Sequence, residues 1–111
     1  MKRGEIYFMN IDPTVGQEIR KTRPVVIVSN NANNKVSATI TVIPITSNVT
    51  KVFPFEVFIA VSESGLPKDS KAQCQQIRTV SVQRIMSHKI GALKSATLEK
   101  INAGIRLHLS V

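Results

Sequence analysis

The sequence is poor in the side chains that hold metal ions or form disulfides. It contains no tryptophan, a single cysteine at position 74 and two histidines, His88 and His108. One cysteine cannot close an internal disulfide, and these three side chains are too scattered for a transition-metal site. We therefore expect no cofactor, a buried thiol at Cys74, and histidines that are structural or solvent-facing rather than an acid–base pair.

Long apolar runs are also missing, and none of those present is long enough to span a bilayer. The chain passes from Lys2-Arg3 directly into a strand-like alternation, without the apolar segment of a secretory signal. Its 111 residues are 42% hydrophobic, which suits one domain over residues 1–111 with a mainly aliphatic core. We expect a soluble, cytoplasmic protein that does not act at a membrane.

Acidic side chains are scarce. Seven Asp and Glu stand against fifteen Lys and Arg, which gives a formal charge of +8 and a pI near 10.2. Nucleic acid is the expected partner, and the alternatives are a membrane surface or a charge that only keeps the protein soluble. Many of the basic residues are dispersed, but Arg20, Lys21 and Arg23 are crowded together. Others are expected in or beside later strands: Lys51, Lys71, Arg78 and Arg84.

Short segments punctuated by Gly, Pro and Asn predict a mainly β fold. In the first segment, the alternation places Ile6 and Phe8 on one face and Tyr7 and Met9 on the other. The strands are expected over residues 4–10, 24–28, 38–46, 54–61, 71–80 and, after a turn at Ser81, 85–90. No alternating strand–helix–strand pattern is present, so we predict a small antiparallel barrel.

The C-terminal segment predicts a helix packed on that barrel or on a partner subunit. Ser95 is the expected N-cap, and the apolar stripe consists of Leu98, Ile101, Ile105 and Leu109. The predicted fold class is therefore mainly β with α, an α+β arrangement in which one helix follows the barrel.

A permanently charged side chain stands where the most apolar strand begins. Pro24 to Val28 is an uninterrupted run, typical of a strand covered on both faces, and proline fits only at its start. Arg23 is thus mounted on a rigid element beside a long polar loop, residues 12–22, which suits phosphate binding. The alternative is an ordinary surface ion pair.

Familiar catalytic motifs are missing. The sequence has no Walker loop, no G-x-S-x-G, no H-E-x-x-H and no convincing pair of carboxylates. Any hydrolytic activity must therefore depend on arginine, hydroxyl groups and one carboxylate.

Six short motifs, which follow one another along nearly the whole chain, carry a family resemblance. They are Lys2-Arg3-Gly4-Glu5-Ile6-Tyr7, Pro13-Thr14-Val15-Gly16-Gln17-Glu18, Arg23-Pro24-Val25, Pro44-Ile45-Thr46-Ser47, Phe53-Pro54-Phe55-Glu56-Val57, and Gln76-Ile77-Arg78-Thr79-Val80 with Arg84. The sequence resembles the MazF/PemK family of toxin endoribonucleases. The resemblance implies an SH3-like barrel, a homodimer, and metal-independent, sequence-specific cleavage of single-stranded RNA, the activity of an mRNA interferase.

The resemblance also assigns catalytic residues. Arg23 matches the catalytic arginine of the family and Thr46 its catalytic threonine. Glu18 matches a loop acid that either orients the arginine or takes the proton of the attacking group, and an ion pair with Arg20 or Lys21 is the alternative. Cleavage without metal can use the 2′-hydroxyl of the RNA, which leaves a cyclic phosphate and a free 5′-hydroxyl.

The RNA-binding residues are expected along the same groove. They are Gln17, Arg20, Lys21, Ser47, Lys51, Gln76 and Arg78. Phe53 either stacks on a base or packs in the core or a dimer interface. Ser81 departs from the family pattern, in which an Asp is common at this position, and this departure weakens the expectation of a capped turn before Arg84.

These features lead to one main hypothesis and two alternatives. The main hypothesis is an endoribonuclease toxin that a cognate acidic antitoxin neutralises by ordering along the basic groove. The first alternative keeps the fold and binds gyrase, as CcdB-like toxins do, because fold alone does not determine function. The second is a non-catalytic RNA-binding barrel.

Overall fold

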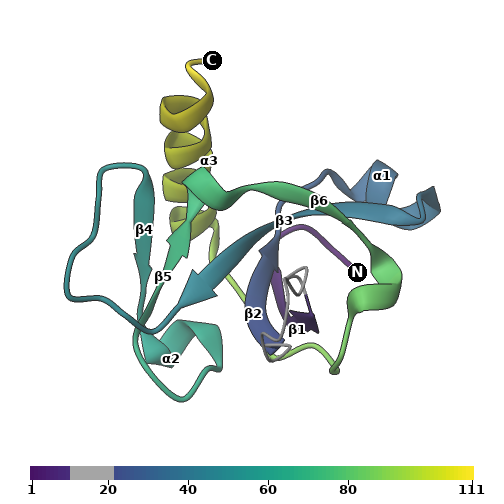
Figure 1. The fold of residues 1–111 in the computed structure, drawn as a ribbon, viewed down its shortest axis with the longest axis horizontal. Coiled ribbons are helices and arrows are strands. Elements are labelled where there is room, and N and C mark those ends of the chain that lie inside the picture. Colours follow the sequence, from purple (N-terminus) through teal and green to yellow (C-terminus); the bar gives the residue numbers. More distant parts are fainter. Residues whose placement is uncertain (11–21) are drawn as a thin grey trace, which may run out of the picture.

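A computed structural model of the chain describes residues 1–10 and 22–111. Over this part, seven strands form an antiparallel half-barrel with the order β4-β5-β3-β2-β1-β7, and β6 also pairs with β3 (Figure 1). The strands are β1 (Glu5–Asn10), β2 (Thr22–Ile27), β3 (Thr39–Thr46), β4 (Glu56–Ile59), β5 (Ser70–Gln73), β6 (Arg78–Ser81) and β7 (Gly91–Ala92). The helices are α1 (Asn31–Val36), α2 (Val61–Ser64) and α3 (Ser95–Leu109), with 3₁₀ turns η1 (Cys74–Gln76) and η2 (Val82–Arg84).

The two faces of β1 and β2 contact two separate hydrophobic clusters. Ile6 and Phe8 pack in the cluster that also contains Ile101 of α3, whereas Tyr7 and Met9 pack in the second cluster. The alternation predicted for the first strand is therefore confirmed. The residues of β2 alternate between the same clusters, so this strand is covered on both faces as its apolar run predicted.

The single strand predicted over residues 71–80 is wrong, because two strands occupy this segment. Ile45 of β3 pairs with Ala72 and Val42 with Arg78, so that two residues of β3 (43–44) face five of the opposing segment (73–77). Pro44 lies in this gap and has no N–H to donate to a ladder. The extra residues form η1, which carries Cys74 into the core.

The strand predicted over residues 85–90 is also wrong. Within this segment only Ile85 forms a bridge, with Met9, and the N–H of Ile90 donates to the carbonyl of Ile6. Regular pairing with β1 resumes at β7, where Gly91 lies opposite Ile6. A Cβ on Gly91 would come within 2.2 Å of the Ser64 carbonyl oxygen, so this edge passes too close to α2 for a side chain.

Helix α3 starts differently from its prediction. Ser95 is the first helical residue, Lys94 is the cap position, and no cap side chain bonds to the helix. Instead, the Glu63 carboxylate of α2 accepts hydrogen bonds from the Lys94 N–H at 2.8 Å and the Thr97 hydroxyl at 2.9 Å. An acid at this end also interacts favourably with the helix dipole.

The apolar stripe of α3 packs on the sheet over most of its length. Leu98, Ile101 and Ile105 contact the core, whereas Leu109 is exposed. Gly104 permits this approach, because a Cβ there would lie 2.7 Å from the Cys74 Sγ. Among the helices of the described ranges, none is long and apolar enough to cross a membrane.

Candidate functional site

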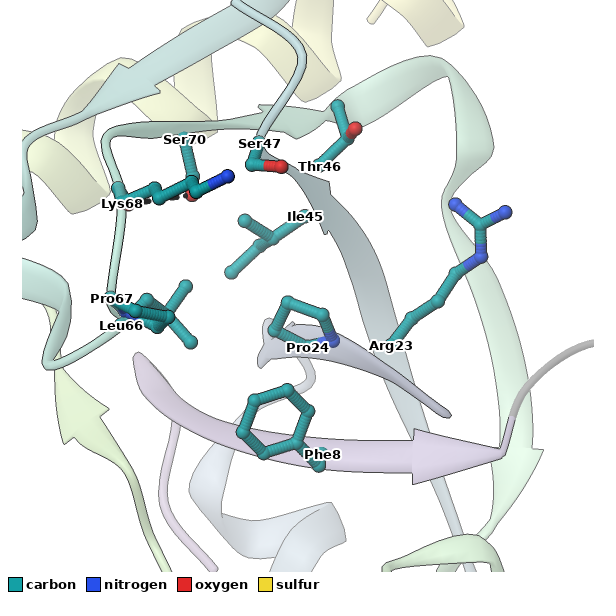
Figure 2. A pocket seen from close by; sticks show the side chains of 10 residues that line it. All are labelled: Phe8, Arg23, Pro24, Ile45, Thr46, Ser47, Leu66, Pro67, Lys68 and Ser70. Atoms are coloured by element: carbon teal, nitrogen blue, oxygen red, sulfur yellow. Dashed lines mark hydrogen bonds between the residues drawn. The ribbon is translucent and has the colours of Figure 1, made fainter. Parts of the chain in front are cut away.

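Arg23 and Thr46 lie on neighbouring strand ends. The β2–β3 ladder ends at Val25 opposite Pro44, so that Arg23 and Thr46 each lie two residues beyond its last pair. Arg23 also pairs with Met9 of β1, and Thr46 pairs with Lys71 of β5. The side chains of Arg23 and Thr46 line one cavity of about 360 Å³ (Figure 2).

The strand alternation separates these polar side chains from the core. Pro24 and Ile45 point the other way from Arg23 and Thr46, toward the apolar part of the cavity lining (Figure 2). Pro24 also pairs with Phe8 of β1, which fixes the position of Arg23 in the sheet. The charged group predicted from the Arg23-Pro24 sequence is thus held on a rigid strand at the edge of a cavity.

The hydroxyl oxygen of Thr46 has a defined orientation. It accepts a hydrogen bond of 3.2 Å from the backbone N–H of Asn48. Since a hydroxyl both donates and accepts, this bond leaves its hydrogen to be donated to another acceptor. Together, the guanidinium and the hydroxyl can donate several hydrogen bonds to an anion in the cavity.

Most of the rest of the cavity comes from residues that sequence reasoning did not assign to the site. Its apolar lining consists of Phe8, Pro24, Ile45, Leu66 and Pro67, and its polar lining includes Ser47, Lys68 and Ser70. Of these, only Ser47 was expected at the site. The loop that contains Leu66, Pro67 and Lys68 follows Gly65, and a loop signal of this kind was the only sequence feature that could have drawn attention to it.

The other predicted RNA-binding residues are distributed around this cavity or lie outside the described residues. Lys51 and Gln76 are exposed, and Arg78 is half-buried opposite Val42, on the same side of β3 as Thr46. The predicted residues for which the structure gives no description are Gln17, Glu18, Arg20 and Lys21.

Lys71 does not belong to the basic surface, contrary to the sequence-based expectation. Its ammonium donates to Glu56 Oε1 at 2.7 Å and to the Lys51 carbonyl at 2.5 Å, and the residue is only 7% exposed. Gln75 and the backbone of Phe53 also donate to the Glu56 carboxylate, at 2.7 and 3.0 Å. Burial alone would raise the pKa of Glu56, but these hydrogen bonds, that from Lys71 first, outweigh it and lower the pKa.

Phe53 lies above this ion pair. Its ring is stacked on that of Phe55, with centroids 5.6 Å apart, and the ammonium of Lys51 lies 5.1 Å from its centroid. It is 41% exposed, so it is not a core residue of this subunit. Its exposed ring suits base stacking or packing in a dimer interface.

The turn before Arg84 is capped in spite of the missing aspartate. The Ser81 side chain accepts a hydrogen bond of 3.2 Å from the Gln83 N–H, as an N-cap of η2. Arg84 then donates to the Asn10 carbonyl at 3.0 Å. The doubt that Ser81 raised about this turn is therefore removed, because a serine hydroxyl caps it instead.

Neither histidine approaches the cavity lining. His88 lies in the segment before β7, His108 near the end of α3, and both are exposed. Cys74 is fully buried, as predicted, and burial raises the pKa of its thiol to about 11. Within residues 1–10 and 22–111, His, Cys, Asp and Glu do not gather into a group of three that could hold a metal ion.

Comparison with known protein families assigns the chain to one of them. Residues 2–109 match the model of the PemK-like, MazF-like toxins of type II toxin-antitoxin systems. The chain belongs to this toxin family. A curated member, endoribonuclease MazF9 of Mycobacterium tuberculosis, is 39% identical over 116 residues, covering 100% of this chain and 98% of the relative.

Other members agree in sequence and in fold. Endoribonuclease EndoA of Bacillus subtilis is 33% identical over 112 residues, covering 100% of this chain and 96% of the relative. A chain in a MazE-MazF crystal structure from Deinococcus radiodurans superposes with a TM-score of 0.83 at 21% identity, covering 100% of this chain and 96% of that one. The predicted family and the predicted fold class are both confirmed.

Proposed function

We propose that this chain is an endoribonuclease toxin that cleaves single-stranded messenger RNA in the cytoplasm, at a short recognition sequence and without a metal ion. The observation that carries the proposal is that Arg23 of β2 and Thr46 of β3 line one cavity. Its relatives in Mycobacterium tuberculosis and Bacillus subtilis are named endoribonucleases, which favours RNA cleavage over the gyrase-binding and non-catalytic alternatives.

The reaction is an internal transfer at phosphorus. The 2′-oxygen of one ribose attacks the adjacent phosphorus, the bond from phosphorus to the 5′-oxygen breaks, and the products are a 2′,3′-cyclic phosphate and a free 5′-hydroxyl. One proton must leave the 2′-hydroxyl and one must reach the 5′-oxygen. DNA lacks the 2′-hydroxyl nucleophile and is not a substrate.

Arg23 and Thr46 stabilise the charge that develops on the phosphoryl oxygens. The guanidinium presents a planar set of donors that matches two phosphate oxygens, and it stays charged throughout the reaction. The Thr46 hydroxyl donates to the same phosphate. Glu18, which lies outside the described residues, is the proposed acceptor of the 2′-hydroxyl proton or the residue that orients Arg23.

The RNA backbone continues from the cavity along basic and polar side chains. Ser47 is at the cavity itself, and Lys51, Gln76 and Arg78 extend the surface along the adjoining strands and loops. Gln17, Arg20 and Lys21, which lie outside the described residues, are the other proposed RNA-binding residues. A cognate acidic antitoxin would occupy the same positive surface, which makes its binding competitive with RNA.

The active form is a homodimer. Exposed apolar side chains gather on β4 and α3, where Phe58 is 47% and Leu107 54% exposed, beside a groove lined by both elements. Apolar side chains exposed together in this way are typical of an interface.

The chain in the antitoxin-bound Mycobacterial endoribonuclease structure has the same fold, with a TM-score of 0.81.

A single-atom change in the substrate tests the chemistry. Two RNA oligonucleotides with one mapped cut site are compared in excess chelator, one all-ribose and one with deoxyribose only at the scissile step. We expect the all-ribose strand to be cut to a cyclic phosphate and the deoxy strand to bind but stay intact. Cleavage of the deoxy strand, or a product with a 5′-phosphate, would contradict the mechanism. The Arg23→Ala protein, purified identically, controls for contaminating nucleases.

A further inference from the structure

We propose that the cavity beside Arg23 and Thr46 holds the nucleobase next to the scissile phosphate, and that Lys68 selects a base with a carbonyl oxygen at its edge. This inference rests on the proposed function. It assigns Phe8, Leu66 and Pro67 to the apolar walls of a base pocket and makes Lys68 a specificity-determining residue.

The lining of the cavity suits a flat, partly apolar ligand. The rings of Phe8 and Pro24 and the side chains of Ile45 and Leu66 form its apolar part, and Arg23 and Thr46 stand at its rim, with their polar ends directed away from these apolar side chains (Figure 2). Its volume of about 360 Å³ lies at the small end of ligand pockets, which range from roughly 300 to 1,000 Å³. A phosphate needs only the polar side, so the apolar side has to be explained by another part of the substrate.

A base attached to the ribose at the cut fits this division. Single-stranded RNA is read by placing unstacked bases against apolar and aromatic side chains while their edges form hydrogen bonds. The nucleotide that presents its phosphate to Arg23 therefore presents a base to the adjoining apolar wall.

The loop that supplies this wall is held in place by hydrogen bonds. The Leu66 N–H donates to the Ser64 hydroxyl at 3.0 Å, and the Ser70 hydroxyl donates to the Lys68 carbonyl at 3.0 Å. The Asp69 carboxylate accepts from the Val61 N–H at 2.8 Å, and Gly65 adopts a left-handed conformation with φ of 76°. A loop fixed at both ends presents a preformed pocket rather than one that orders around the ligand.

Lys68 is the charged residue of this loop that faces the cavity. Its side chain is exposed and extends toward Ser47 across the opening (Figure 2). Among the described residues, no carboxylate lies within ion-pairing distance of its ammonium, and the adjacent Asp69 is engaged with the Val61 backbone. An ammonium donates three hydrogen bonds and accepts none. It therefore favours uracil, guanine or cytosine, whose carbonyl oxygens are strong acceptors, over adenine, which offers only ring nitrogens beside its amino group.

The test measures sequence preference. An RNA oligonucleotide library, randomised around a mapped cut site, is cleaved by the wild type and by Lys68→Ala, and the products are sequenced. We expect the wild type to disfavour adenine at one nucleotide flanking the cut by about tenfold, the effect of one hydrogen bond to a charged group. Lys68→Ala should remove that discrimination. Lys68→Gln, whose amide both donates and accepts, should tolerate adenine as well.

A charge-matched control separates base contact from phosphate contact. Lys35→Ala removes the same charge from the exposed last turn of α1 and should leave the preference unchanged. An unchanged preference in Lys68→Ala would overturn the inference. So would a uniform loss of affinity over all sequences with a salt slope reduced by about 0.7, because that is the signature of a phosphate contact. Failure of the wild type to cleave any RNA would instead overturn the proposed function itself, and this inference with it.

Discussion

Two cations lie on the strands next to β3, yet their surroundings differ. Lys71 of β5 pairs with Thr46, and Arg23 belongs to β2, which pairs with β3 up to Pro44. Lys71 is buried against Glu56, whereas Arg23 lines the cavity. Only the second is placed to meet a phosphate.

This difference shows why a formal charge of +8 overstates the surface available to RNA. The Lys71–Glu56 pair joins the loop at Lys51 and Phe53 to the β4–β5 hairpin through four hydrogen bonds, three of them to the carboxylate. The buried pair is thus a structural element of the wall beside the site, and Arg23 is the proposed reactive cation.

The largest expected effect is on catalysis at Arg23. Arg23→Ala should lower single-turnover cleavage about 1,000-fold or more, because it removes donors aimed at the developing charge. Arg23→Lys keeps the charge but not the planar set of donors, so its activity should lie between that of the wild type and that of Arg23→Ala. Thermal unfolding should stay close to the wild type in both. Near-normal cleavage by Arg23→Ala would remove this residue from the mechanism.

Removing the buried cation should affect folding rather than chemistry. Lys71→Met leaves the Glu56 carboxylate buried without its partner and should lower the free energy of unfolding by about 3–5 kcal/mol. The double variant Lys71→Met/Glu56→Leu should recover much of this loss, since no unpaired charge remains. Urea denaturation measures both. Wild-type stability combined with lost cleavage in Lys71→Met would reverse the roles assigned to the two cations.

A smaller effect is expected in the pH dependence of stability. The pKa of Glu56 is lowered from its ordinary 4.5 by folding, so its contribution is fully present above that value and is lost as the pH falls below it. Glu56→Gln should therefore flatten the decline in unfolding free energy as the pH falls below 4.5. Glu99→Gln, an exposed residue of α3, is the control. An unchanged pH profile in Glu56→Gln would argue against a stabilised carboxylate.

Local patterns predicted the parts of the fold that depend on local structure. The alternation of β1 predicted its two faces, and the apolar run after Arg23 predicted a strand covered on both sides. The spacing of Leu98, Ile101 and Ile105 predicted the buried stripe of α3. In each case the periodicity of one element determines which of its residues meet the core.

The predictions failed where a residue distant in sequence determines the local structure. The break between β5 and β6 depends on Pro44 in the opposing strand and on Gly104 of the C-terminal helix. Gly104 has no side chain and so leaves room for Cys74. The helix cap comes from Glu63, about thirty residues before the helix, and displaces the local candidate Ser95. Lys71 looked like a surface cation because nothing in its own segment reveals Glu56.

The candidate site likewise has one part that the sequence predicts and another part that only the folded chain reveals. Arg23 was singled out by its position before an apolar strand, and Thr46 was assigned by the family resemblance; in the folded chain both line one cavity. The cavity wall at Leu66 to Lys68 comes from a loop without a periodic signal, so its position opposite Arg23 follows only from the folded chain.

The central claim is that Arg23 and Thr46 act on the same phosphodiester, and a double-mutant cycle tests it most directly. Single-turnover cleavage is measured for the wild type, Arg23→Ala, Thr46→Val and the double variant on one RNA oligonucleotide. If the two side chains work as a unit, the double variant should lose no more than about tenfold beyond the worse single variant. Losses that simply multiply would mean that the two residues act independently, and would contradict the account.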